Sequence, residues 1–160
     1  GVTASMFHIV VYVLMSMGAF IGAMMVAHST GNDKIADFAG LIKRAPLTAV
    51  TMLIIFLSLI GIPPLAGFWG KLLFVYAAVS AGGWKIWLAV ILVINGVIAL
   101  YYYANVIKHM FLLEASNNKC FPQPVSYTTV LIICVTALLL IGIFPGYLMD
   151  FVGAAAETLF

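Results

Sequence analysis

Four long apolar runs constrain the fold of this chain more than any other feature of its sequence. They cover residues 5–27, 47–79, 84–107 and 125–148. A helix needs about 20 mainly apolar residues to cross roughly 30 Å of hydrocarbon, and each run reaches that length. The connections between the runs are too short for a water-soluble domain. The sequence therefore predicts an all-α fold, a polytopic transmembrane helical bundle of four helices that forms a single transmembrane region over residues 1–160.

The composition supports this fold class and excludes others. Hydrophobic residues make up 65% of the chain and charged residues only 8%, whereas soluble domains are roughly half apolar. Lipid is therefore expected to cover most of the outer surface. The net charge of +2 comes without a basic patch, which excludes nucleic acid as a partner. Cys120 and Cys134 show neither zinc-ligand spacing nor a disulfide pattern, and we expect no metal or cofactor on this chain.

The distribution of cations predicts the orientation in the membrane. Lysine and arginine accumulate in short cytoplasmic loops. Five cations lie in the first and third connections: Lys34, Lys43, Arg44, Lys108 and Lys119. The opposite side has only Lys85, at the start of the third run. We therefore expect the first and third connections to be cytoplasmic and both termini to lie on the outer side of the membrane.

The second apolar run is too long for one straight helix. At 1.5 Å per residue it would extend about 50 Å, well beyond the hydrocarbon thickness. Its middle carries Gly61, Pro63, Pro64 and Gly67. The prolines remove amide donors and the glycines allow non-helical backbone, so the helix is expected to break near residues 61–67. The freed backbone groups must face protein or water, and such breaks are where transporters build ion sites.

Lys71 follows this break by about two helical turns and is the only charged residue deep inside any run. One interpretation is a lysine that extends its ammonium group to the membrane interface. The other is a protonatable site, which we favour because apolar sequence continues on both sides and leaves no interface nearby. Desolvation disfavours the ammonium form, so this lysine could release a proton, as an arginine could not. No run contains Asp or Glu, so a counter-ion must come from elsewhere or the lysine must be neutral.

The first run carries a polar stripe of His8, Tyr12 and Ser16, spaced at i, i+4 and i+8 along one helix face. For the stripe as a whole, helix packing with hydrogen bonds between helices is the favoured interpretation. His8 alone is more open, because a membrane histidine can relay protons, while its position near the end of the run suits an interfacial role equally well. His8 and Tyr12 are thus candidate residues of a proton path.

The third run places Asn95, Tyr102 and His109 on one face, at i, i+7 and i+14. They lie beside Tyr101 and Tyr103, and a tyrosine run near a helix end typically belongs to an interfacial aromatic belt. The alternative is a hydrated polar path, in which His109 would be a further candidate for proton transfer.

Two stretches carry a resemblance to a known family. The first reads Asp-Phe-Ala-Gly-Leu-Ile-Lys-Arg-Ala-Pro over residues 37–46, and the second reads Ser-Leu-Ile-Gly-Ile-Pro-Pro-Leu-Ala-Gly-Phe-Trp-Gly-Lys over residues 58–71. Together they resemble the antiporter-like membrane subunits of respiratory complex I, most of all the subunit N family, the counterpart of NADH dehydrogenase subunit 2. Residues 12–20 and 101–103 are similar to that family as well.

The resemblance implies a fold and a function. Such subunits have about fourteen transmembrane helices, and this chain would supply the last four, as a split polypeptide or a piece of a longer one. The broken helix would belong to the C-terminal inverted repeat, with Lys71 as the terminal lysine on the proton path toward the outer side. The chain would act in a proton-translocating NADH:quinone oxidoreductase. It would have no redox centre of its own and would couple electron transfer elsewhere in the complex to proton movement.

The resemblance also implies the location and the partners. We expect an integral protein of an energy-coupling membrane, the bacterial or archaeal cell membrane, that contacts lipid, neighbouring antiporter-like subunits and small hydrophobic subunits. Two alternatives stay open. One is a subunit of an Mrp-type cation/proton antiporter, a membrane-bound hydrogenase or a reduced-deazaflavin dehydrogenase. The other is a purely structural membrane anchor, in which Lys71 could be replaced without loss of activity.

Overall fold

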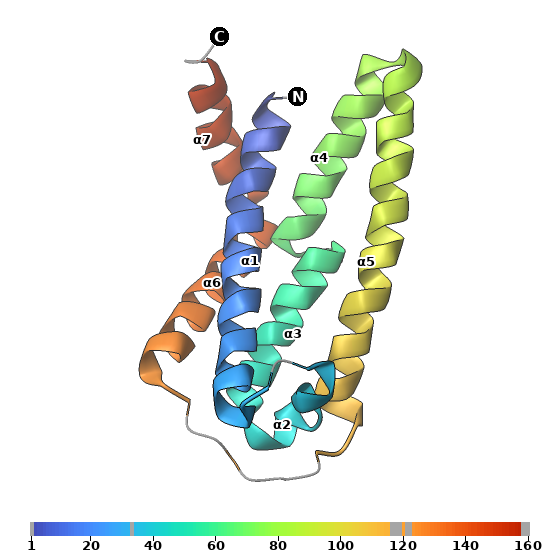
Figure 1. Cartoon of the computed structure of the whole chain (residues 1–160). Coiled ribbons are helices and arrows are strands. Elements are labelled where there is room, and N and C mark those ends of the chain that lie inside the picture. The colour runs from blue at the N-terminus through green and yellow to red at the C-terminus, as the bar shows by residue number, and fades with distance from the viewer. Residues whose placement is uncertain (1, 33, 116–119, 121–122, 158–160) are drawn as a thin grey trace.

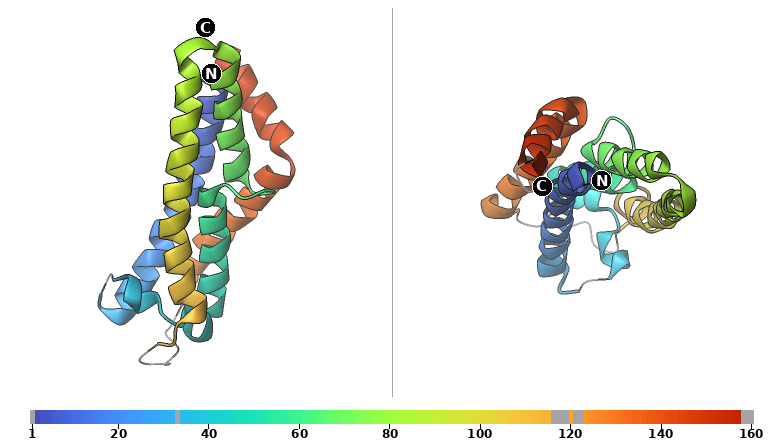
Figure 2. Two further views of the ribbon diagram at one scale, coloured as in Figure 1. Left: turned by 90° about the vertical axis from the view of Figure 1, so that its right-hand side faces the viewer. Right: turned by 90° about the horizontal axis from the view of Figure 1, so that it is seen from above.

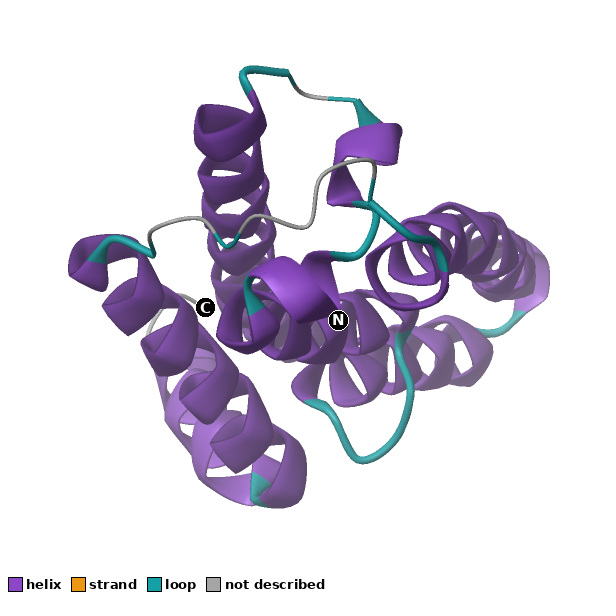
Figure 3. Cartoon of the chain, turned by 90° about the horizontal axis from the view of Figure 1, so that it is seen from below, coloured by secondary structure: helices purple, strands orange, loops and turns teal. Residues whose placement is uncertain are grey.

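The computed structural model describes residues 2–32, 34–115, 120 and 123–157. Every regular element within these residues is a helix (Figure 3), and the predicted all-α bundle is confirmed. The long helices are α1 (Val2–Thr30), α5 (Ile86–Leu112) and α6 (Val125–Ile143). The shorter ones are α2 (Leu41–Arg44), α3 (Pro46–Ile60), α4 (Ala66–Ala81) and α7 (Pro145–Glu157), with the 3-10 helices η1 (Ile35–Phe38) and η2 (Gly83–Lys85).

The second apolar run forms two half-helices instead of one helix. α1, α6 and the stretch Gly83–Leu112 are each long and apolar enough to span a bilayer. α3 and α4, with 15 and 16 residues, reach only about 22 to 24 Å at 1.5 Å per residue, less than the roughly 30 Å of hydrocarbon. They lie end to end with a lateral offset (Figure 1), so that together they make one crossing. The predicted break of this run is confirmed.

Contacts between helices build the bundle around the two half-helices and α1. α1 packs against α3, α4, α6 and α7, while α5 packs against α3 and α4 (Figures 1 and 2). One apolar cluster, which includes Phe7 and Leu138, joins α1 to α6, and a second, which includes Met52 and Met110, joins α1, α3 and α5. Both ends of the chain and the turn from α4 to α5 lie at one end of the bundle, opposite α2 and the C-terminal ends of α1 and α5 (Figure 1).

The prediction of a single helix over residues 125–148 is wrong, because the fourth run is divided between two helices. α6 ends at Ile143 and α7 begins at Pro145. Phe144 between them has φ −122° and ψ 63°, outside the helical region. A residue before proline avoids the helical conformation, and proline suits the first position of a new helix because it has no amide hydrogen. The apolar run is continuous, but its backbone is interrupted.

The third run forms a helix that ends later than predicted. α5 continues past Ile107, through Lys108 and His109, to Leu112. Met110 is fully buried in the same apolar cluster as Leu41. Burial of this side chain stabilises a last turn that the polar residues alone would not predict.

Candidate functional site at the break between α3 and α4

The break begins where α3 runs into Gly61. Gly61 has φ 93°, a left-handed conformation that glycine adopts at little cost. The amides of Gly61 and Ile62 both donate to Leu57 O, and the peptide bond between Pro63 and Pro64 is cis. Regular helical pairing resumes in α4 at Ala66. The break therefore covers residues 61–65, and Gly67, which the prediction placed in the break, already belongs to α4.

Ser58 and Gly67 hold the two half-helices together. The backbone amide of Gly67 donates to the buried Ser58 Oγ at 3.1 Å. This bond satisfies one of the free amides at the start of α4, which in lipid would otherwise lack a partner. A side chain at Gly67 would overlap the carbonyl oxygen of Ser58. Glycine is thus required by close approach at this position.

Lys71 reaches back across the break from the second turn of α4. Its Nζ donates to Leu59 O at 2.7 Å and to Ile60 O at 2.8 Å. These are the last carbonyls of α3, where the helix dipole favours a cation. The ammonium group therefore points into the middle of the bundle and not toward either end of it. The aliphatic part of Lys71 lies against Gly61, where a side chain would crowd it.

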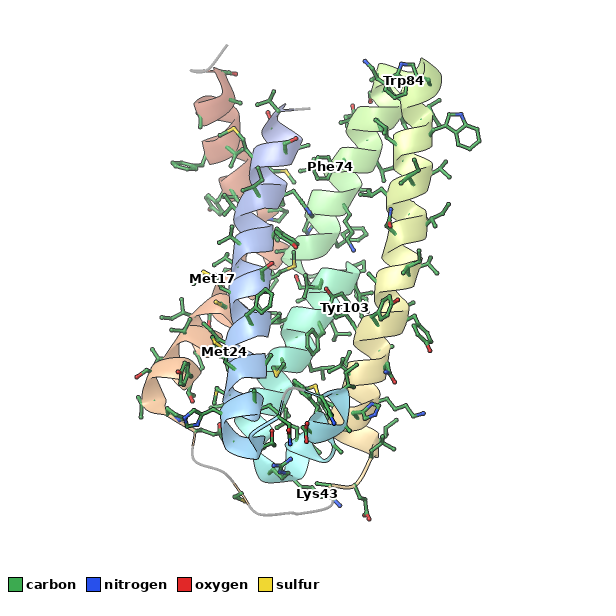
Figure 4. The ribbon with its side chains drawn as sticks, viewed as in Figure 1. Met17, Met24, Lys43, Phe74, Trp84 and Tyr103 are labelled. Carbon is green, nitrogen blue, oxygen red and sulfur yellow. The ribbon has the colours of Figure 1, made fainter. Side chains whose placement is uncertain are left out.

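His8 on α1 faces the turn of α4 that carries Lys71. Its ring makes an edge contact with Phe74, at 5.1 Å between centroids, and Phe74 lies between α1 and α4 in Figure 4. The ring also fills the space where a side chain at Gly70 would lie. His8 Nδ1 is buried and has no hydrogen-bond partner within the described part of the chain. His8 therefore lies against the residue that directly precedes Lys71.

The other two candidate residues lie at different distances from the break. The ring of Tyr12 stacks with that of His8, at 6.1 Å between centroids, and extends the polar stripe of α1 away from Lys71. His109 lies in the last turn of α5, where its Nδ1 is 2.8 Å from Asn105 O and its own carbonyl accepts from the amide of Gly40. The structure brings Lys71, His8 and Tyr12 together and leaves His109 apart.

The face of α5 that includes Asn95 and Tyr102 does not converge on the break. Both side chains are exposed, and Asn95 Nδ2 donates to Ile91 O within its own helix. Acidic residues within the described ranges are Asp37, Glu114, Asp150 and Glu157, all outside the half-helices. In the same ranges no three His, Cys, Asp or Glu side chains cluster as a metal site would require.

Sequence reasoning missed Trp69 and Gly142. Trp69 Nε1 donates to Gly142 O at 2.8 Å. Gly142 also packs directly on the backbone of Pro64 and Ala66, with no space for a side chain. The end of α6 is thus docked on the break between α3 and α4. The Phe144-Pro145 pair signals the second interruption, but no local pattern connects it with Trp69.

Comparisons with known proteins identify the family of this chain. The family described as NADH:quinone oxidoreductase/Mrp antiporter, transmembrane, matches residues 1–99. NADH-quinone oxidoreductase subunit N of Heliobacterium modesticaldum is 40% identical over 162 residues, which cover 100% of this chain and 34% of the relative. Subunit N 2 of Sorangium cellulosum is 40% identical, with 99% of this chain and 32% of the relative covered. The chain therefore spans about a third of the length of the curated relatives it matches.

Solved structures share the fold. A chain of respiratory complex I from Thermus thermophilus superposes with a TM-score of 0.77 and 27% identity, over 94% of this chain and 34% of that one. A chain of the membrane-bound sulfane sulfur reductase, an archaeal respiratory membrane complex, gives a TM-score of 0.87 and 25% identity, over 98% of this chain and 31% of that one.

Proposed function

Because this chain belongs to the NADH:quinone oxidoreductase/Mrp antiporter transmembrane family, we propose that it acts within a proton-translocating subunit of a complex I-type NADH:quinone oxidoreductase. The identity to relatives named subunit N supports this assignment. Electron transfer would take place on other subunits, and this chain would contribute side chains that move protons through the membrane.

The observation that carries the proposal is the pair of hydrogen bonds from Lys71 Nζ to Leu59 O and Ile60 O. A protonated lysine donates strongly to carbonyls at the negative end of a helix dipole. When Nζ loses a proton, the positive charge disappears and its attraction to these carbonyls weakens. Proton release at Lys71 would therefore loosen the contact between α3 and α4, and proton uptake would restore it.

His8 is the candidate acceptor on α1. A neutral imidazole has one ring nitrogen free to accept a proton, and the buried Nδ1 has no partner within the described residues. In the proposed step the proton leaves Lys71 Nζ, and His8 or a water between the two residues takes it up. Lys71 then becomes a neutral amine and the acceptor gains one positive charge.

The free-energy cost of placing or moving a charge in the membrane is similar in size to the free energy of the hydrogen bonds that Lys71 makes. A cation at the bilayer centre costs about 2.5 to 3.5 kcal/mol on insertion scales, and moving one charge across 100 mV takes about 2.3 kcal/mol. Hydrogen bonds to charged groups contribute about 1.5 to 3 kcal/mol each. Making or breaking the two bonds of Lys71 can therefore offset the cost of charging and discharging it.

A second candidate function follows from the likeness to the archaeal respiratory complex. The matching family covers Mrp antiporters as well, so the chain could serve an Mrp-type antiporter, a membrane-bound hydrogenase or a reduced-deazaflavin dehydrogenase. In each of these complexes the broken helix and Lys71 would have the same role in proton transfer. The redox subunits encoded alongside this chain would distinguish these complexes.

The orientation follows from the cation distribution. α2 and the C-terminal ends of α1 and α5 lie at the end of the bundle that carries Lys34, Lys43, Arg44 and Lys108, and the chain ends lie at the other (Figure 1). By the positive-inside rule, the cation-rich end would face the cytoplasm and both termini the outer side. The surrounding partners would be lipid, other antiporter-like subunits and small hydrophobic subunits of a bacterial or archaeal cell membrane.

The test is proton pumping by the assembled complex in membrane vesicles. Lys71→Ala should lower the proton-to-electron ratio, and so should Lys71→Arg, because arginine keeps the charge but does not release a proton. Lys85→Ala, which removes a cation at the turn before α5, should pump as the wild type does. Wild-type ratios for both Lys71 variants in assembled complex would refute the proposal.

A further inference from the structure

α7 starts at the level of the break between α3 and α4. α6 is tilted in the bundle (Figure 1), and Gly142 near its end packs on the backbone of Pro64 and Ala66. From there α7 runs beside α1 to the end of the bundle that carries both chain ends, as α4 runs to the same end (Figures 1 and 2). α7 therefore crosses the same half of the membrane as α4, although the apolar run that predicts this crossing ends at residue 148.

This arrangement brings Asp150 into the membrane. Asp150 is the sixth residue of α7, as Lys71 is the sixth residue of α4. At 1.5 Å per residue it lies about 8 Å beyond the start of its helix, whereas half of the hydrocarbon layer is about 15 Å thick. Its side chain is exposed and forms no hydrogen bond or ion pair within the described part of the chain. An ionised carboxylate is costly in hydrocarbon unless it is paired.

The depth of Asp150 indicates what kind of partner it needs. Lipid headgroups begin about 7 Å farther out, at the edge of the hydrocarbon. The aspartate side chain has a single methylene group, so it does not extend to the interface as a long lysine side chain does. Ionised groups at such depth pair with other charged side chains or face water-filled cavities. The cavity beside Asp150 is apolar, so a cationic side chain of another protein segment is the better match.

The face of α7 around Asp150 is free to receive such a segment. Tyr147, Asp150, Phe151 and Ala154 share one side of the helix, at i, i+3, i+4 and i+7. All four are exposed, Tyr147 at 81% and Phe151 at 74%, whereas Val152 on the other side of α7 is 3% exposed. α7 lies at the edge of the bundle away from α5 (Figure 2). This face therefore points away from the rest of the chain.

An apolar notch of about 490 Å³ adjoins this face where α6 meets α7. Its lining consists of Leu140, Ile141, Phe144, Tyr147, Leu148 and Phe151. The notch lies at the interruption before Pro145, where the chain turns from α6 into α7 (Figure 1). Outward-facing apolar side chains are ordinary in lipid, but a notch beside a buried charge is typical of a protein interface, where an anchor side chain fills a pocket.

We propose that this face of α7 docks a transmembrane helix of a neighbouring subunit, and that a lysine or arginine on that helix pairs with Asp150. An apolar side chain of the same helix would fill the notch, and the small Ala154 would allow close approach of the two backbones. The inference rests on the proposed function in one respect, namely that the chain works within a multi-subunit membrane complex. It adds to that function an interface and the chemistry of the partner.

The first experiment compares Asp150→Asn with Glu157→Gln in the full-length subunit of the assembled complex. Asparagine keeps the size of the side chain and removes only the charge. Glu157 is the last residue of α7, at the end of the bundle, and is the matched control for the loss of one negative charge. On native gels after incubation in detergent, Asp150→Asn should lose a neighbouring subunit several-fold faster than the wild type. Glu157→Gln should lose it at the wild-type rate.

The second experiment identifies the partner helix while Asp150 stays intact. The photoreactive residue p-benzoylphenylalanine replaces the exposed Tyr147 in the full-length subunit, and the purified complex is irradiated. Mass spectrometry of the cross-linked peptide should give a membrane helix of another subunit with a lysine or arginine in its apolar stretch. Replacing that cation by aspartate should release the subunit, and adding Asp150→Lys to the same complex should retain it again.

The outcomes separate this inference from the proposed function. A cross-link only to lipid, only to the same polypeptide, or only to a helix without a cation would overturn the docking proposal. So would an Asp150→Asn complex that holds all its subunits as the wild type does. In each of these cases loss of pumping in Lys71→Ala would leave the proposed function intact. Conversely, wild-type pumping by Lys71→Ala would refute that function while the cross-link and the charge exchange still test the interface.

Discussion

Trp69 Nε1 donates a hydrogen bond of 2.8 Å to the carbonyl oxygen of Gly142. This bond joins the break between α3 and α4 to the interruption between α6 and α7. The last carbonyls of a helix have no partner within it, so the indole satisfies a group that lipid could not. Gly142 also touches the backbone of Pro64. Each interruption therefore helps to cover the freed backbone of the other.

Gly142→Ala should destabilise the bundle by about 1 to 3 kcal/mol, the usual cost of overpacking. The added methyl group would overlap the carbonyl oxygen of Pro64, which belongs to the backbone and cannot move aside as a flexible side chain could. Thermal unfolding of the purified complex in detergent would show the loss as a lower Tm. Gly153→Ala in α7 is the control, because nothing lies within 4 Å of its added methyl group. Equal Tm values for the two variants would contradict the tight contact.

Ser58→Ala should weaken the junction between the half-helices. It removes the oxygen that accepts from the amide of Gly67, and loss of such a cap typically costs about 0.5 to 2 kcal/mol. Hydrogen exchange at the amide of Gly67 should become faster, because opening the break costs less free energy. Thr129→Ala, whose hydroxyl is exposed and bonds only to Val125 O of its own helix, should leave that exchange rate unchanged. Unaltered exchange in Ser58→Ala would mean that another group protects the amide.

Local chemistry made the main break predictable. Pro63 and Pro64 between two glycines cannot continue a helix, and Lys71 is the only charge in a long apolar run, so both features can be recognised without a structure. The interruption at Pro145 was equally visible, but it lies near the end of a run whose length alone suggests one helix. Length indicates that a segment crosses the membrane and does not indicate that its backbone is continuous.

Contacts between distant segments were not predictable from this sequence. Nothing near Trp69 indicates that its indole meets Gly142, because the pairing depends on how α6 packs on the break. The spacing of the polar stripe on α1 predicts that His8 and Tyr12 share a helix face. Only the fold shows that His8 on this face meets α4. The shared face on α5 had equal periodicity, yet Asn95 bonds within its own helix. Periodicity gives the face of a helix, and packing decides what that face meets.

The hydrogen bonds of Lys71 to α3 and its proposed role in proton transfer are separable, and two substitutions distinguish them. Arginine keeps the positive charge and the donors that reach Leu59 O and Ile60 O, but it does not release a proton. Lys71→Arg should therefore retain most of the wild-type stability and lose coupled proton transport. Methionine is similar in size, with neither donors nor charge, so Lys71→Met should lose both.

Two opposing free-energy terms determine whether Lys71→Met raises or lowers the stability of the complex. Removing the cation relieves about 2.5 to 3.5 kcal/mol of insertion cost, while the two lost hydrogen bonds from a charged group contribute about 1.5 to 3 kcal/mol each. The bonds outweigh the relief, and the carbonyls left behind have no donor, so the Tm of Lys71→Met should fall below that of Lys71→Arg. Both variants are compared as assembled complexes, by Tm in detergent and by proton pumping in vesicles. If the Lys71→Met complex is as stable as the wild type, Lys71 has no structural role. If the Lys71→Arg complex pumps normally, Lys71 does not transfer protons.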